Sequence, residues 1–198
     1  ISSAQLAQPQ RGFSFLEDGP LDMRMSPSHS VTASDLVNTL PMNQLADLIY
    51  QNGEERFSRR IAKAIVELRK DFPLSTTFQL VDVIRRVVPP AYRHGRIHCA
   101  TRTFQALRIA VNSELDVIEP ALREAVELLV PGGRMGVISF HSLEDRIVKH
   151  TFRSMAHGKE ALVSALTKKP IVASREEQQR NPRSRSAKFR VIERKGNA

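Results

Sequence analysis

The chain has 198 residues, of which 41% are hydrophobic and 26% are charged. This composition allows a buried core and argues against wholesale disorder, and no apolar run approaches the roughly 18 residues needed to span a bilayer. The single cysteine, Cys99, excludes an intramolecular disulfide and favours a reducing compartment. The first residues show no signal peptide and lack an initiator Met, so we expect a fragment.

The formal net charge of +9 is unevenly distributed. Residues 85–108 contain six arginines and no acidic residue, and residues 175–195 hold eight Lys or Arg against three Glu, a net of +5. Clustered basic tracts of this kind are the electrostatic footprint of a nucleic-acid-binding protein. A solvated basic face is the plainer interpretation. An acidic membrane surface is disfavoured, because no basic amphipathic segment stands alone at a terminus.

The first half of the chain is predicted to be irregular and then helical. Residues 1–34 are interrupted by Pro and Gly and should form loops. Three short amphipathic helices follow: one at about 42–51, one within 54–71, and one that begins after a cap in 75–77 and ends at Pro89-Pro90. Together they predict a compact helical subdomain over roughly 38–95.

The second half mixes helices and strands. A longer helical stretch covers 103–130, with Pro120 starting a second helix inside it. Next the sequence predicts a buried parallel strand at 134–140, a helix at 142–155, a poorly patterned link over 156–182 and a strand at 187–191. This layout is half of an α/β sheet. Either strands are undetected or the first half of the sheet lies upstream of Ile1, and we favour the second.

Polar residues crowd the end of the predicted strand at 134–140. They are Ser139, His141, Ser142, Glu144, Asp145 and Arg146. Ligands of open α/β sheets bind just beyond the carboxyl ends of the strands. The plainer interpretation is that Ser142 caps the next helix and that the two acids favour its positive end. Because capping does not account for His141 or Arg146, we favour a functional site here.

A second candidate is the turn around residues 18–24. Asp18 and Asp22 lie four residues apart, with Arg24 nearby. The two carboxylates could accept hydrogen bonds from an amine-bearing substrate. They could equally serve the turn alone, with Asp18 bonded to its own backbone.

Two further motifs carry weaker signals. His94, His98 and Cys99 do not supply the four ligands of a structural zinc site, so we expect no metal. Residues 181–186, Asn-Pro-Arg-Ser-Arg-Ser, could contact phosphate or form an ordinary loop. The chain contains no nucleophile elbow, no P-loop and no Gly-rich dinucleotide fingerprint.

Seven segments, in chain order, resemble one known family. They are Gln10-Arg-Gly-Phe-Ser-Phe15, Gly19-Pro-Leu-Asp-Met-Arg-Met25, Gly53-Glu-Glu-Arg56, Ala100-Thr-Arg-Thr-Phe-Gln-Ala-Leu-Arg-Ile109, Val111-Asn-Ser-Glu-Leu115, Ser139-Phe-His-Ser-Leu-Glu-Asp-Arg146 and Asn181-Pro-Arg-Ser-Arg-Ser186. The family is the MraW type of S-adenosylmethionine-dependent methyltransferase, which modifies N4 of a decoding-site cytidine in small-subunit ribosomal RNA. The resemblance runs nearly from end to end and is weakest over 156–180.

The resemblance implies an α/β fold: a Rossmann-like methyltransferase sheet, with its second half present, interrupted by an inserted all-helical subdomain. We accordingly expect residues 1–37 to be a partial methyltransferase domain. Residues 38–108 would be the inserted substrate-recognition domain. Residues 109–198 would be the C-terminal half of the methyltransferase domain.

The cofactor implied by the resemblance is S-adenosylmethionine. Residues 1–6 match the latter part of a strand-end motif of its pocket, so Gln5 would touch the cofactor. Ala7 replaces the acid that usually follows. The glycine-rich loop and the acid that grip the cofactor belong to the upstream half of the family, so we expect this fragment to be inactive alone.

The substrate implied is an extruded cytosine. Its N4 is a weak nucleophile, so catalysis must orient it and accept an N–H hydrogen bond as its lone pair localises. The residues expected to surround the base are Ser2, Ser3, Asp22 and His141. The residues expected to hold RNA phosphates are Arg102, Arg108, Arg183 and Arg185.

The sequence therefore predicts a ribosomal RNA cytosine-N4 methyltransferase. Its partner would be small-subunit ribosomal RNA or a ribosomal subunit, with no membrane and no DNA involved. We expect the bacterial cytoplasm or, alternatively, a mitochondrion or plastid. The alternative function is a non-catalytic RNA- or ribosome-binding module. A generic helical scaffold ranks third, because it leaves the strand-end polar cluster unexplained.

Overall fold

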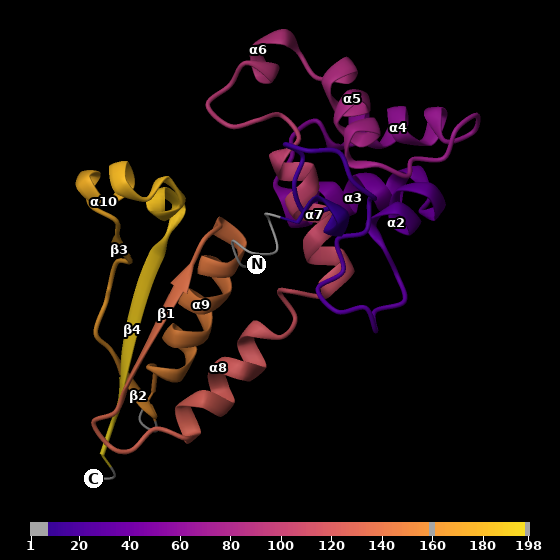
Figure 1. Ribbon diagram of the computed structural model, residues 1–198. Helices are drawn as coiled ribbons and strands as arrows, with labels where there is room; N and C mark the ends of the chain where they lie inside the picture. The colour runs from indigo at the N-terminus through magenta and orange to yellow at the C-terminus, as the bar shows by residue number, and fades with distance from the viewer. Residues whose placement is uncertain (1–7, 159–160, 197–198) are drawn as a thin grey trace. The chain divides into compact units, whose positions relative to one another are not determined.

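The computed structural model describes residues 8–158 and 161–196 (Figure 1). Contacts divide the chain into two units, Ile1–Glu114 and Leu115–Ala198, here called unit 1 and unit 2. Over the described residues the fold is mixed α/β, with nine α-helices and one small antiparallel sheet. None of the described helices combines the length and the apolar character that crossing a bilayer requires.

Unit 1 is helical after an irregular start. Its helices are α2 (Ala33–Thr39), α3 (Met42–Gly53), α4 (Ser58–Leu68), α5 (Thr77–Val87), α6 (Pro90–Arg93) and α7 (Thr101–Asn112). The three predicted helices are confirmed as α3, α4 and α5. Thr76 caps α5 by accepting a hydrogen bond from the Gln79 amide, and the Gln79 side chain accepts one from the Thr76 amide. The prediction did not include α2, which has a capping box of its own between Thr32 and Asp35.

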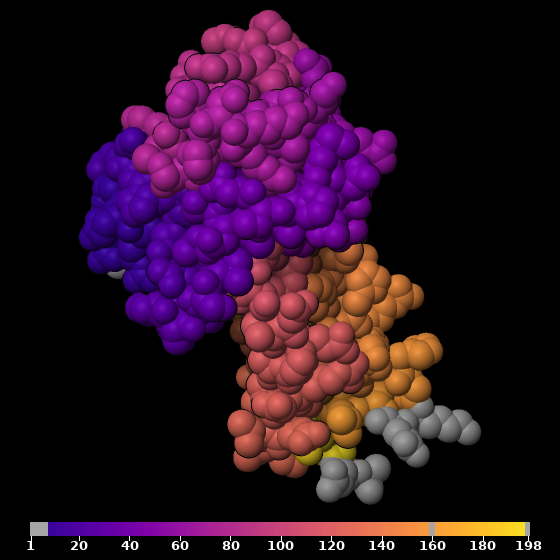
Figure 2. Space-filling model, turned by 90° about the vertical axis from the view of Figure 1, so that its right-hand side faces the viewer, coloured from indigo at the N-terminus to yellow at the C-terminus, as the bar shows by residue number. Residues whose placement is uncertain are grey.

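The irregular segment shares its core with these helices. Leu21 and Met23 are 1% and 0% exposed and belong to the same buried cluster as Leu45, Ile65 and Leu107. Figure 2 shows unit 1 as closely packed atoms coloured from indigo to magenta. The contacts thus join residues 13–37 to the helices that follow them and place the boundary after residue 114. The division at residues 37 and 108 stays a prediction.

Glycine allows α3 and α7 to approach closely. Gly53 is buried at the end of α3, and a Cβ atom there would collide with the backbone carbonyl of Arg102 on α7. Only glycine leaves room for this contact. Arg102 donates a hydrogen bond from Nη1 to the carbonyl of Glu54 at 2.7 Å, which ties the next turn to the same helix.

Unit 2 contains a sheet with helices on one face. Its elements are α8 (Ile118–Glu127), β1 (Arg134–Ser139), α9 (Ser142–Met155), β2 (Val163–Ala165), β3 (Ile171–Val172), α10 (Arg175–Arg180), the 3₁₀ helix η2 (Pro182–Ser186) and β4 (Lys188–Arg194). The helix predicted at 142–155 is confirmed as α9. The stretch 103–130 does divide into two helices, α7 and α8, although α8 begins two residues before Pro120.

All strand pairs described in unit 2 are antiparallel. β4 pairs with β1 along one edge, and its other edge pairs with β2 and β3 at opposite ends (Figure 1). The prediction of a buried parallel strand at 134–140 is therefore wrong for the described residues. Apolar side chains of α8 and α9 cover one face of the sheet, around Ile192. On the other face Ile138 is 57% exposed, so its apolar character does not reflect burial within unit 2.

Candidate functional site

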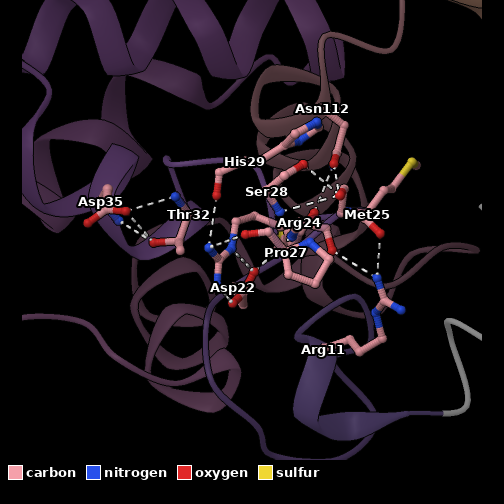
Figure 3. Close-up of polar contacts among 12 residues, drawn as sticks. Arg11, Asp22, Arg24, Met25, Pro27, Ser28, His29, Thr32, Asp35 and Asn112 are labelled. Carbon is pink, nitrogen blue, oxygen red and sulfur yellow. Dashed lines mark hydrogen bonds and ion pairs between the residues drawn. The ribbon is translucent and has the colours of Figure 1, made fainter.

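Asp22 and Arg24 form a two-pronged ion pair in the loop that precedes α2 (Figure 3). Arg24 donates from Nε to Oδ1 of Asp22 and from Nη2 to Oδ2, both at 2.8 Å, and its backbone amide also donates to Oδ1 at 2.9 Å. Nη1 of Arg24 donates to the carbonyl of His29 at 2.9 Å. Parallel bonds of this kind fix the direction of both side chains. The carboxylate is therefore preorganised.

Four further hydrogen bonds hold this loop in place. Met23 is buried with a φ of 63°, a left-handed conformation that a long side chain adopts only under strong constraint. The constraint comes from Asn112 at the end of α7, whose side chain accepts from the Met25 amide at 2.7 Å and donates to the Met23 carbonyl at 2.8 Å. Arg11 donates to the carbonyls of Arg24 and Met25. Asn112 and Arg11 thus hold the loop from two separate parts of unit 1.

A hollow of about 230 Å³ opens at this pair and is lined by Gln10, Arg11, Asp22, Arg24 and Pro27. Hydrogen bonds from the Arg24 side chain hold the pKa of Asp22 below its ordinary value, although burial acts in the opposite direction. Asp22 is therefore an anion near neutral pH. Its Oδ1 accepts two hydrogen bonds and its Oδ2 accepts one, so Oδ2 keeps room for one more donor. The group can accept a hydrogen bond, but it is a poor permanent proton acceptor.

Asp18, the other carboxylate of this motif, has a structural role. Its Oδ1 accepts from the amides of Gly19 and Phe78, both at 3.0 Å, and the second of these lies in the first turn of α5. The hydrogen bond from the Phe78 amide is the largest cause that lowers the pKa of Asp18. The plainer interpretation, in which Asp18 serves the backbone, accounts for these contacts.

The strand-end cluster is arranged differently from the prediction. The N-cap of α9 is His141 rather than Ser142. Nδ1 of His141 accepts from the Glu144 amide at 3.3 Å, and Glu144 accepts in return from the backbone amides of Phe140 and His141. Capping therefore does account for His141, because a ring nitrogen can take the place of the usual hydroxyl or carboxylate oxygen.

Asp145 anchors α9 to the sheet. It accepts from Nε and Nη2 of Arg190 on β4 at 2.7 and 3.2 Å, and from Nζ of Lys188 at 3.2 Å. Asp145 and Arg190 are only 7% and 6% exposed. Burial favours the neutral acid, but the hydrogen bonds and charges of Arg190 and Lys188 outweigh it and lower the pKa of Asp145. The Asp145–Arg190 pair, here called the clamp, therefore holds the first turn of α9 against β4.

The remaining predicted residues lie as follows. Ser2, Ser3 and Gln5 lie outside the described residues. Asp22 belongs to unit 1 and His141 to unit 2. Arg108 donates from Nε to Glu114 at 2.7 Å and is 18% exposed. Arg183 and Arg185 are exposed on η2.

Sequence reasoning missed three residues of these networks. Arg11 and Asn112 stood inside motifs that resemble the family, but nothing local linked them to Asp22, because Asn112 lies 87 residues from Met25. Arg190 was assigned only to a basic strand. The alternation of apolar and basic residues in 187–191 predicts that the basic side chains face away from the core, whereas Arg190 is only 6% exposed.

Comparison with known proteins identifies the family. The model of the MraW methylase family matches residues 1–195. The chain belongs to this family. Proteins called ribosomal RNA small subunit methyltransferase H are similar to it: 56% identical over 194 residues in Rippkaea orientalis and 55% in Synechococcus elongatus. A third, from Pelobacter propionicus, is 50% identical over 206 residues.

Each of these three alignments covers 98% of the chain, and the aligned parts make up 61%, 63% and 66% of the three relatives. The chain thus spans less than two thirds of the length of the relatives it matches. The predicted resemblance to the MraW type is confirmed, since a family model and relatives at 50% identity or more agree on it.

Proposed function

We propose that the chain is part of an S-adenosylmethionine-dependent enzyme that methylates N4 of a decoding-site cytidine in small-subunit ribosomal RNA. The match to the MraW methylase family over residues 1–195 is the observation that carries the reaction class. The relatives' shared name, ribosomal RNA small subunit methyltransferase H, supports the substrate. These relatives are bacterial, which supports the cytoplasm as the compartment.

We propose that Asp22 accepts a hydrogen bond from the N4 amino group of the cytosine. The lone pair of N4 is delocalised into the cytosine ring, and it localises on nitrogen as the new bond forms. An anionic acceptor that already points at the N–H group stabilises this change without reorganising. Oδ2 of Asp22 has room for one more donor, Arg24 fixes its direction, and Asn112 holds the backbone on either side of Arg24. In this scheme Arg24 is a positioning residue.

The strand-end turn lacks the features of a nucleotide-binding turn. In Rossmann-type folds a glycine-rich turn between strand and helix receives the nucleotide. The turn between β1 and α9, residues 139–142, contains no glycine, and His141 and Glu144 fill the helix N-terminus. This turn therefore does not fit the nucleotide. Gln5 stays a proposal for cofactor contact, as do Ser2, Ser3 and His141 for the substrate side.

The proposal extends to the fold and to the phosphate contacts. We propose that β1 and β4, with α8 and α9 on one face, belong to a Rossmann-like methyltransferase sheet. Arg183 and Arg185 are proposed to contact RNA phosphates because both are exposed. Arg102 and Arg108 are proposed with them, although each also makes a contact within the chain: Arg102 with the Glu54 carbonyl and Arg108 with Glu114.

A second candidate is binding of RNA or of a ribosomal subunit without methyl transfer. The observation that favours it is the tract of six arginines and no acid over 85–108, which supports RNA binding whether or not a reaction follows.

Mass spectrometry of ribosomal RNA nucleosides tests the first proposal. Strains would carry the intact gene, a deletion, Asp22→Asn or the matched control Asp71→Asn, which removes a charge at an exposed position. We expect N4-methylcytidine to disappear in the deletion and in Asp22→Asn but to persist in Asp71→Asn. Equal N4-methylcytidine with and without the gene would refute the function. A normal level in Asp22→Asn alone would refute the role of Asp22.

A further inference from the structure

A second pocket, of about 290 Å³, lies where α3 turns into α4 in unit 1. Its lining includes Asp47 and Tyr50 of α3, Arg56 and Phe57 of the turn, and Arg59 and Arg60 of α4. None of these residues is among the predicted site residues. The lining combines basic and aromatic side chains with a single carboxylate.

Arg56 is held over two aromatic rings. Its guanidinium carbon lies 4.8 Å from the centre of the Phe57 ring and 5.1 Å from that of Tyr92. The two rings meet edge to face at 4.9 Å. The Tyr92 hydroxyl donates to the buried carboxylate of Glu55, which also accepts from the Phe57 amide. This buried anchor preorganises Arg56 as a flat, positively charged platform.

The pocket carries an excess of positive charge, because three arginines line it against one carboxylate, Asp47. Over the described residues, no carboxylate forms an ion pair with Arg56, Arg59 or Arg60. Arg59 and Arg60 stand in the first turn of α4, which has no acidic residue, and cations there are disfavoured by the helix dipole. A bound anion would relieve both effects. Arginine side chains match phosphate well because they donate in a fork.

The pocket also offers an aromatic surface. Tyr50 is 61% exposed, and its ring makes no ring contact with any described residue. Unpaired RNA bases stack on aromatic rings and on arginine planes, whereas a duplex hides the faces of its bases. Arginines that can donate hydrogen bonds to a phosphate, next to a ring on which a base can stack, match one nucleotide of a single strand.

We propose that this pocket binds a nucleotide of single-stranded RNA, with the base stacked on Tyr50 beside the Arg56 platform and the phosphate held by Arg59 and Arg60. The inference rests on the proposed function for its RNA substrate, and it adds a contact surface on the helical unit. In this proposal the pocket positions the RNA.

Fluorescence anisotropy of the 198-residue chain with a labelled single-stranded RNA 12-mer tests the proposal. We expect Tyr50→Ala to weaken binding about tenfold and Tyr50→Phe to leave it within about twofold, because stacking needs only the ring. The double variant Arg59→Ala/Arg60→Ala should weaken binding and reduce the salt slope by about 0.7, since the two arginines hold one phosphate and each phosphate contact on a single strand contributes about 0.7. The same RNA as a duplex should bind more weakly.

The matched control is Lys63→Ala/Lys70→Ala, which removes the same charge from exposed positions outside the pocket. It should leave the salt slope unchanged. Wild-type binding by the Tyr50→Ala and double-arginine variants would overturn the proposal, and so would an equal loss of slope in the lysine control. Normal binding by the pocket variants would leave the methylation proposal intact. Absence of N4-methylcytidine from wild-type ribosomal RNA would refute the methylation proposal and leave the binding result unaffected.

Discussion

The clamp between Asp145 and Arg190 yields the sharpest stability prediction. Asp145→Ala would leave Arg190, 6% exposed, as a buried cation that has lost both of its hydrogen bonds to the carboxylate. Removing one partner of a buried ion pair destabilises a protein by about 3–5 kcal/mol. For a unit the size of 115–198 this lowers the unfolding temperature by roughly 12 °C or more. The clamp joins α9 to β4, so unit 2 should carry the whole effect.

Calorimetry and hydrogen exchange of the β4 amides would measure this loss. The matched control is Arg134→Ala, which breaks the Arg134–Glu193 pair of the same sheet, where the side chains are 68% and 31% exposed. It should destabilise by at most about 1 kcal/mol. The double variant Asp145→Leu/Arg190→Met should recover most of the lost stability, because no unpaired charge stays buried. Equal effects of Asp145→Ala and Arg134→Ala would refute the reasoning.

The same clamp has a defined pH dependence. The pKa of Asp145 is lower in the folded chain than its ordinary value of 3.8. Its contribution to stability is therefore present above about pH 4 and is lost as the pH falls through the lowered folded value. The stability difference between wild type and Asp145→Ala should shrink in this acid range. A difference that stays constant down to pH 2 would contradict the assignment.

Three further changes test other parts of the fold. Asn112→Ala removes the bonds that fasten the loop of Met23 and should destabilise unit 1 by about 1–3 kcal/mol; urea unfolding would measure it, and an unchanged midpoint would contradict the role. Gly53→Ala should separate α3 from α7 and lower the unfolding temperature of unit 1, because the new Cβ would collide with the carbonyl of Arg102. An unchanged or raised unfolding temperature would contradict the close approach of the two helices. His141→Ala should weaken α9 by about 1 kcal/mol, whereas His141→Asn, which keeps a capping acceptor, should restore it.

Helices were predictable from the sequence because their signals are local. Apolar spacing marked α3, α4 and α5, and the cap at Thr76 with the prolines after Val88 bounded α5. The bounds predicted for α9, 142–155, match the structure. The predicted N-cap, Ser142, was wrong by one residue: the N-cap is His141, and its ring nitrogen accepts the hydrogen bond that the Ser142 hydroxyl was expected to accept.

The strands were harder to predict because their environment is not local. The apolar run of β1 indicated burial, yet Ile138 lies on a face that unit 2 leaves exposed. β2 and β3 have three and two residues and no pattern of their own, and they exist as strands only by pairing with β4. Such pairs are decided by contacts that a sequence window does not contain.

The features of the candidate sites also fall into those that the sequence predicted and those that needed the tertiary structure. Sequence alone determined the family, the basic character and the identity of Asp22 as a residue of interest, because motifs and charge are written locally in the chain. Only the tertiary structure decided that Arg24 orients Asp22, that Asn112 holds the backbone of this loop, and that Arg56 lies over Phe57 and Tyr92. One physical reason is distance along the chain, since Asn112 lies 87 residues from Met25 and Tyr92 lies 37 residues from Glu55. Arg24 and Asp22 are close in sequence, but the directions of their side chains are fixed only once the core has formed.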